Sequence, residues 1–263
     1  MNVGLCTWAF HRSAAGRRDV AEIGAIAARA GFTALEGAYN PRGVVSLTAP
    51  RPDALPVPIA SLASLEFHRH SLTSARVEDR AQAQGIIEAM LRCAAAWDIP
   101  SISFSPGAAP ADDDRTSLLQ RLATELAPLT ALAAELGVTL ALENVPRHVL
   151  ASRGDMATLL NELPGVGFCL DVGNTLVDPP LSAWCDLLGD RVVKVHLSDG
   201  RVSDGRWGPA WLGAGELDWR DVRGFLAESR VRDVFVEVLS DGSTDDDAFT
   251  QRIAGSVHEV LAG

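Results

Sequence analysis

The segment VVKVHLSDG, residues 192–200, constrains the fold of this chain more than any other. Successive side chains of a strand point to opposite faces, so Val193, Val195 and Leu197 share one face while Lys194 and His196 share the other. A plain buried core would not place Lys and His together on one face of a strand. The pattern is typical of a parallel barrel that is covered by helices outside and carries its chemistry inside, near the strand ends.

Three other strand-like runs end on side chains that bind metal ions. TLALE ends on Glu143, GFCLD on Asp171 and DVFVE on Glu237, and loop-like sequence follows each run. With His196 they bring three carboxylates and one imidazole to one end of the strands, a set suited to one divalent ion such as Mn²⁺, Mg²⁺, Co²⁺ or Zn²⁺. The alternative is an inert polar network balanced by Lys194. Three carboxylates beside a single Lys would repel one another, which favours the metal.

Strand-like and helix-like segments alternate about eight times along the chain. The expected strands are residues 3–8, 32–36, 59–65, 99–104, 139–143, 167–171, 192–200 and 233–238. The expected helices are residues 19–30, 74–97, 112–136, 181–188, 218–229 and 245–261, with one more helix starting after Ser152. Residues 40–58 hold five prolines, so the second helix is expected to be short or irregular. Such alternation implies parallel strands, and eight units favour a single (β/α)₈ TIM barrel over residues 1–263.

Composition narrows the class of ligand. A formal net charge of −11 argues against a nucleic acid partner, which needs a basic surface, and is compatible with a cation and a small molecule. No run of about 18 apolar residues is present, so no membrane span is expected. The first residues lack the pattern of a signal peptide, and the four cysteines form no CxxC pair. We therefore expect reduced, buried thiols and a cytoplasmic location, with a homo-oligomer left open.

Aromatic and polar side chains near the expected strand ends are candidates for substrate contact. Trp8 and Trp211 would offer flat apolar walls to the C–H faces of a sugar or polyol, and His68 and His148 follow expected strands. Residues 198–216, rich in Gly and Trp, are expected to form a long mobile loop over the site.

Lys194 lies one layer below His196 on the same face of its expected strand. A charge in the barrel interior needs a partner. We expect Lys194 to pair with Glu36 or Glu66, which makes it a structural residue.

Seven sequence pieces, in chain order, resemble the xylose-isomerase-like TIM-barrel superfamily, the sugar phosphate isomerase/epimerase group with its ketose 3-epimerases, hydroxypyruvate isomerases and inosose dehydratases. The pieces are GLCTWAF, GFTALEGA, ALENVP, CLDVGNT, VVKVHLSDG, LGAGELDW and VFVEVLSDG. The resemblance implies one divalent ion, often Mn²⁺, held by Glu143, Asp171, His196 and Glu237. It also implies that Glu143 and Glu237 are the acid–base pair of an isomerase or epimerase that acts on a keto-sugar or related hydroxy-carbonyl compound through an enediolate.

Two positions bear on the exact reaction. Family members often carry a His three residues after the Asp ligand, where this chain has Asn174, which can hydrogen-bond substrate but cannot shuttle a proton near neutral pH. Many members carry an Arg in the loop after the His ligand, for which Arg201 is the candidate. The nearest alternative is therefore a metal-dependent dehydratase of an inosose or keto-sugar. More distant alternatives are an endonuclease IV-like nuclease, which needs more histidines and a basic face, and a metal-free binding subunit.

Overall fold

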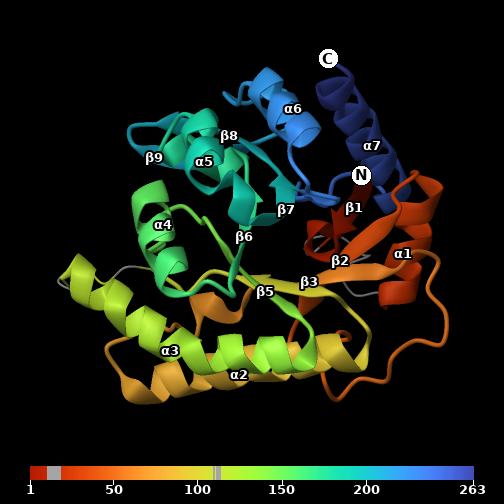
Figure 1. The fold of residues 1–263 in the computed structure, drawn as a ribbon. Helices are drawn as coiled ribbons and strands as arrows, with labels where there is room; N and C mark the ends of the chain where they lie inside the picture. Colours follow the sequence, from red (N-terminus) through yellow and green to blue (C-terminus); the bar gives the residue numbers. More distant parts are fainter. Residues whose placement is uncertain (11–18, 109, 111–113) are drawn as a thin grey trace.

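Eight parallel strands close into a barrel in the computed structural model, which describes residues 1–10, 19–108, 110 and 114–263 (Figure 1). Around the barrel the strands are β1 (Asn2–Cys6), β10 (Asp233–Val236), β7 (Val192–Leu197), β6 (Gly167–Asp171), β5 (Thr139–Glu143), β4 (Ser101–Phe104), β3 (Ile59–Ser64) and β2 (Ala34–Tyr39). β2 pairs with β1, which completes the ring. The expected (β/α)₈ barrel is confirmed.

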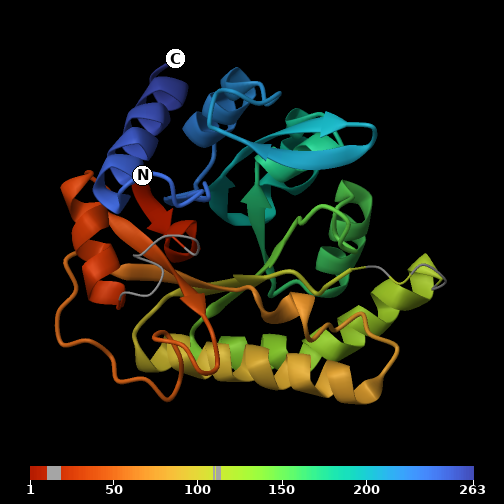
Figure 2. The same ribbon diagram turned by 180° about the vertical axis from the view of Figure 1, so that it is seen from behind.

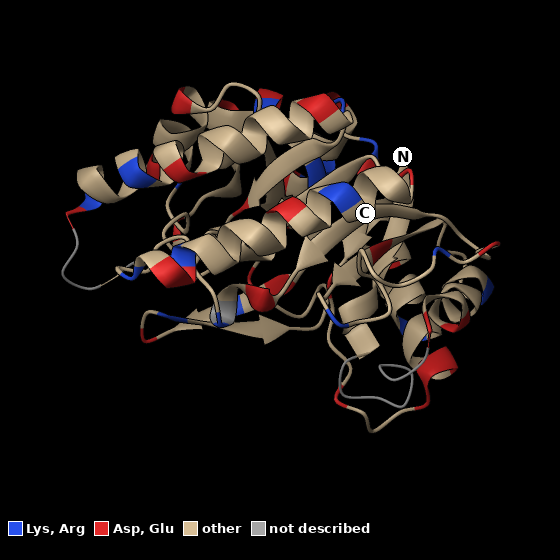
Figure 3. Cartoon of the chain, turned by 90° about the horizontal axis from the view of Figure 1, so that it is seen from below, with Lys and Arg blue, Asp and Glu red and all other residues tan. Residues whose placement is uncertain are grey.

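Helices cover the outside of this ring in both views (Figures 1 and 2). The described residues form seven: α1 (Val20–Arg29), α2 (Val77–Ala96), α3 (Arg115–Leu136), α4 (Arg153–Glu162), α5 (Leu181–Leu188), α6 (Trp219–Glu228) and α7 (Asp246–Ala262). Between β2 and β3, residues 40–58 form turns and no helix, as their prolines predict. Acidic and basic residues are mixed along the outer helices, while most of each strand is uncharged (Figure 3). No helix in the described part of the chain is long and apolar enough to span a bilayer.

Aspartates fix where several helices begin. The carboxylates of Asp19, Asp114 and Asp245 accept hydrogen bonds from backbone N–H groups three residues on, at 2.8 to 3.0 Å. These bonds satisfy donors that a helix start leaves unpaired. Ser152 occupies the expected start of α4, but its side chain makes no capping bond. Asp114 and Asp245 are therefore structural caps of α3 and α7.

The lower interior of the barrel is filled by an apolar side chain beside a buried charge. Phe235 of β10 points inward, and Lys194 of β7 lies with its ammonium 6.0 Å from the centre of the Phe235 ring. Gly4 of β1 pairs with Phe235, and a Cβ at Gly4 would approach that ring to 2.6 Å. The missing side chain at Gly4 thus makes room for Phe235, which forms a floor below the strand ends.

Residues 198–216, which the sequence predicted to form a long mobile loop, contain regular secondary structure. They contain an antiparallel hairpin of β8 (Asp199–Ser203) and β9 (Arg206–Ala210). The buried carboxylate of Asp199 accepts hydrogen bonds from the backbone N–H groups of Gly213 and Gly215 and from the indole of Trp219. The indole of Trp207 donates to the carbonyl of Gly173 at 3.0 Å. These bonds hold the hairpin against the barrel, and Trp207, Pro209 and Ala210 of β9 line the cavity.

Candidate metal centre

Four predicted ligands meet at the carboxyl ends of neighbouring strands. Glu143 ends β5, Asp171 ends β6, His196 lies near the end of β7, and Glu237 follows β10. One ligand atom from each residue lies within 4.8 Å of every other. Asp171 and His196 pair directly in the sheet, and the backbone N–H of Glu237 donates to the carbonyl of Leu197 at 2.9 Å. Parallel register thus converts the four separate strand ends into a single cluster.

The geometry at the centre of this cluster fits a cation. Nδ1 of His196 lies 3.2 Å from Oε2 of Glu237 and 3.6 Å from Oε1 of Glu143. Both His196 Nδ1 and Glu237 Oε2 are buried and have no hydrogen-bond partner among the residues that the structure describes. Buried polar atoms in native proteins almost always have partners, so two orphaned atoms that face one another indicate that a further group binds between them.

The electrostatics of the site also favour a bound cation. Burial raises the pKa of Asp171 well above its usual value, and the carboxylates of Glu237 and Glu143 add to the rise. Burial likewise raises the pKa of Glu143, although His196 opposes it. For Glu237 burial acts in the same direction, but contact with His196 outweighs it and lowers the pKa. Crowded carboxylates of this kind are relieved by a divalent cation, so imidazole and carboxylate ligands together fit the expected metal.

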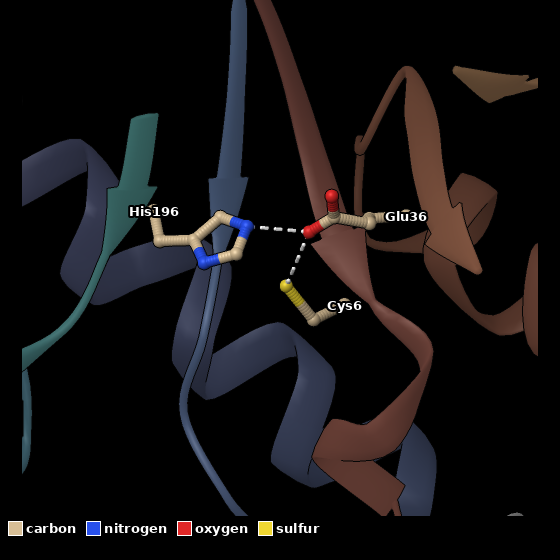
Figure 4. Close-up of side chains that lie close together, drawn as sticks. All are labelled: Cys6, Glu36 and His196. Carbon is tan, nitrogen blue, oxygen red and sulfur yellow. Dashed lines mark hydrogen bonds and ion pairs between the residues drawn. The ribbon is translucent and has the colours of Figure 1, made fainter. Parts of the chain in front are cut away.

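Behind His196 lies a buried carboxylate that orients its ring. Oε2 of Glu36 lies 2.6 Å from Nε2 of His196, and the thiol of Cys6 donates to the same oxygen at 3.6 Å (Figure 4). The other oxygen of Glu36 forms an ion pair with Lys194, whose ammonium also donates to Ser61. Burial would raise the pKa of Glu36, but the charges of His196 and Lys194 prevail and hold it well below its usual range.

The expected Lys194–Glu36 pair is therefore confirmed, while Glu66 accepts a hydrogen bond from Asn40 instead. The bond from Glu36 to His196 adds a second role. With Nε2 engaged by a carboxylate, the ring turns Nδ1 toward the cluster, the arrangement usual for a histidine that binds metal.

We expect Glu36→Gln to damage both stability and metal binding. Loss of the carboxylate leaves Lys194 as a buried unpaired charge, which costs about 3–5 kcal/mol of unfolding free energy. It also weakens the orientation of His196, which lowers metal affinity by about 10–100-fold. Denaturant unfolding of the metal-free protein and titration with Mn²⁺ measure the two effects. In Glu36→Gln/Lys194→Met the unpaired charge is gone, so stability should recover while affinity stays low. Unchanged affinity in both variants would show that Glu36 does not orient His196.

A cavity of about 490 Å³ opens above the cluster, and four of the predicted substrate residues line it: Trp8, His148, Asn174 and Trp211. Trp8 donates its indole N–H to Oε1 of Glu237 at 3.0 Å and meets the His196 ring edge-on. Asn174 is buried, and its backbone N–H donates to Asp171 at 2.8 Å. Trp211 is anchored from behind, with its indole bonded to Ser256 at 2.7 Å and Arg252 stacked on its ring at 3.9 Å.

The structure places only one of the other two predicted substrate residues, and that residue lies away from the cavity. Arg201 is exposed on β8, donates to the carbonyl of Ala214 and does not line the cavity. His68 ends the short 3₁₀ segment Glu66–His68, and its side chain lies outside the described part of the structure.

Sequence reasoning missed Ser105, which lines the cavity and bonds to Nδ1 of His148 at 2.7 Å. It also missed Ser198, which donates to Asp171 at 2.5 Å. Both residues directly follow strands, a signal that could have identified them.

The fold and this cluster together define a parallel TIM barrel with a candidate divalent-metal centre at the carboxyl ends of its strands. The family model for xylose isomerase-like TIM barrels matches residues 11–249, and the chain belongs to that family. No functionally curated protein matches the sequence.

Solved structures with the same fold include several sugar enzymes. The IolI protein with a bound zinc atom superposes with a TM-score of 0.83 at 13% identity, covering 100% of this chain and 98% of that one. An L-ribulose 3-epimerase gives 0.79 at 15% identity, covering 100% and 95%. The 3-keto-D-glucoside 4-epimerase YcjR of E. coli gives 0.77 at 16% identity, covering 100% of both chains. At these identities the likeness establishes the shared fold.

Proposed function

We propose that the protein is a divalent-metal-dependent isomerase or epimerase that acts on a keto-sugar or a related hydroxy-carbonyl compound. The observation that carries the proposal is the cluster of Glu143, Asp171, His196 and Glu237 at the bottom of the cavity, with orphaned atoms facing its centre. Solved structures with this fold also support the proposal, since they include a ketose epimerase, a keto-glucoside epimerase and a zinc-bound protein. Mn²⁺ is the ion we propose, with Mg²⁺, Co²⁺ or Zn²⁺ as the other options.

The residues of this chain divide the work. Asp171 and His196 would hold the ion together with the two glutamates, and a bound divalent ion would polarise the substrate carbonyl and acidify the neighbouring C–H bond. Glu143 and Glu237 come from β5 and from the end of β10, which are separated around the barrel by β6 and β7. One glutamate removes the proton from one face of the substrate, and the other returns a proton to the opposite face. The Trp8 indole fixes one oxygen of Glu237 for this role.

The cavity also limits the substrate. None of the described residues that line it is Lys or Arg, so the visible lining offers no cationic side chain to a phosphate group. Asn174 and Ser105 provide neutral hydrogen-bonding side chains, and Trp8 and Trp207 provide aromatic surface. This lining favours a sugar or polyol-derived substrate without phosphate.

Proton exchange in D₂O tests the proposal. Metal-loaded protein incubated with a panel of keto-sugars and inososes should incorporate deuterium at the carbon next to the carbonyl of its substrate. Product analysis then distinguishes an epimer or isomer from a dehydrated product, which would identify the alternative dehydratase. Absence of exchange across the panel, with metal occupancy confirmed, would contradict the proposal.

A further inference from the structure

The cavity above the metal centre has two chemically different ends. Its buried end carries the carboxylates of Glu143, Asp171 and Glu237. The lining residues that are exposed at its outer part are Leu65, directly after β3, Leu239, after β10, Pro209 and the acidic Asp241. A free sugar needs hydrogen bonds around its whole circumference, so a mostly apolar outer part is a poor match for a free sugar alone.

The side chains of Leu65 and Leu239 are also unusually exposed for leucines that line a binding cavity. Their exposed fractions are 47% and 45%, and both line the same cavity. They approach it from different sides, because β2 and β1 separate β3 from β10 around the barrel. A single exposed leucine is ordinary, whereas apolar side chains gathered at the mouth of a cavity mark a surface that a ligand covers.

The size of the cavity leaves room for such a ligand. Its volume of about 490 Å³ lies within the range of pockets that enclose drug-sized molecules. Phe67, in the 3₁₀ segment after β3, adds an aromatic ring to the lining beside Leu65. Flat apolar groups pack well against aromatic and leucine side chains, so the outer part suits an aromatic ring better than further hydroxyl groups.

We propose that the substrate is a keto-sugar ring that keeps its glycosidic bond to an aromatic aglycone, and that the aglycone lies against Leu65 and Leu239 at the cavity mouth. This inference rests on the proposed function, since it sets the hydroxy-carbonyl group of the sugar at Glu143 and Glu237. The reaction itself is unchanged: one C–H bond of the sugar ring breaks and re-forms, and the glycosidic bond stays intact. The aglycone contributes binding energy remote from the reacting carbon.

Binding of two unreactive probes tests the aglycone site apart from catalysis. Phenyl β-D-glucoside and methyl β-D-glucoside share the sugar, lack a keto group and differ in the aglycone. Calorimetric titration of the Mn²⁺-loaded protein should give a dissociation constant at least about tenfold lower for the phenyl glucoside, which corresponds to ~1.4 kcal/mol. In Leu65→Ser/Leu239→Ser the ratio of the two constants should fall toward one. Leu187→Ser, an equally drastic change at a 53% exposed leucine of α5 outside the cavity, should preserve the ratio.

Equal constants for the two glucosides in the unmodified protein would overturn the inference, as would a preference that survives in the double variant with Mn²⁺ uptake intact. Different outcomes would contradict the proposed function and the aglycone site. If no keto-sugar, free or glycosidic, exchanges deuterium while the phenyl preference holds, the aglycone site stands and the reaction is wrong. If a free keto-sugar exchanges deuterium and the phenyl glucoside has no advantage, the reaction stands and the aglycone site is wrong.

Discussion

Replacing Glu143 or Glu237 by Gln should lower turnover by at least about 10²–10⁴-fold, the range typical of general acid–base groups, while about one metal ion per chain remains bound. The amide keeps the size of the side chain and still offers an oxygen to a cation, but it cannot accept the substrate proton. Steady-state kinetics with metal analysis of the same samples separates the two effects.

The two variants should also differ in kind, because each leaves one face of the substrate with a carboxylate. One variant is expected to exchange the substrate proton with solvent without completing the epimer. Glu125→Gln is a matched control and should keep full turnover, because Glu125 of α3 is a part-buried carboxylate that pairs with Arg80 of α2. Full activity of Glu143→Gln or Glu237→Gln with metal bound would remove that glutamate from the mechanism.

Asp171→Asn should abolish most of the stabilisation that Mn²⁺ gives the protein without harming the metal-free fold. An ion present at about 100 times its dissociation constant stabilises the native state by ~2.7 kcal/mol, seen as a rise in melting temperature. Burial, together with the neighbouring carboxylates of Glu237 and Glu143, raises the pKa of Asp171, so loss of its charge relieves the metal-free protein of a buried and repelled charge. The amide can still accept the hydrogen bond from Ser198.

Thermal unfolding with and without Mn²⁺ measures both the stabilisation by the ion and the stability of the metal-free fold. Loss of affinity in Asp171→Asn should exceed the about 10–100-fold typical of a residue behind a ligand. His196→Ala should also lose most of the metal, although the cavity it leaves destabilises the barrel. Two results together would identify the cluster as an inert polar network. Mn²⁺ would leave the melting temperature of the unmodified protein unchanged, and protein purified without a chelator would contain no metal.

Much of the candidate site was predictable because two local rules suffice to bring its four proposed ligands together. Side chains alternate along a strand, so Glu143, Asp171, His196 and Glu237 had to share the inward face once their runs were recognised as strands. Parallel strands with helical crossovers bring their carboxyl ends to one side of the barrel. Neither rule requires knowledge of contacts distant in sequence, and the prolines of residues 40–58 excluded a regular second helix in the same local way.

What only the tertiary structure decided depends on contacts between distant parts of the chain. Glu36 meets His196 across 160 positions, because closure of the ring brings β2 and β7 to opposite sides of one narrow interior. Asp199, at the start of β8, accepts hydrogen bonds from N–H groups of residues 213–217 and so fixes the segment that follows the β8–β9 hairpin, while the hairpin itself carries Arg201 away from the cavity. In both cases a buried carboxylate takes whichever donors the fold brings within reach, since an unpaired buried charge is too costly, and sequence spacing alone does not determine those donors.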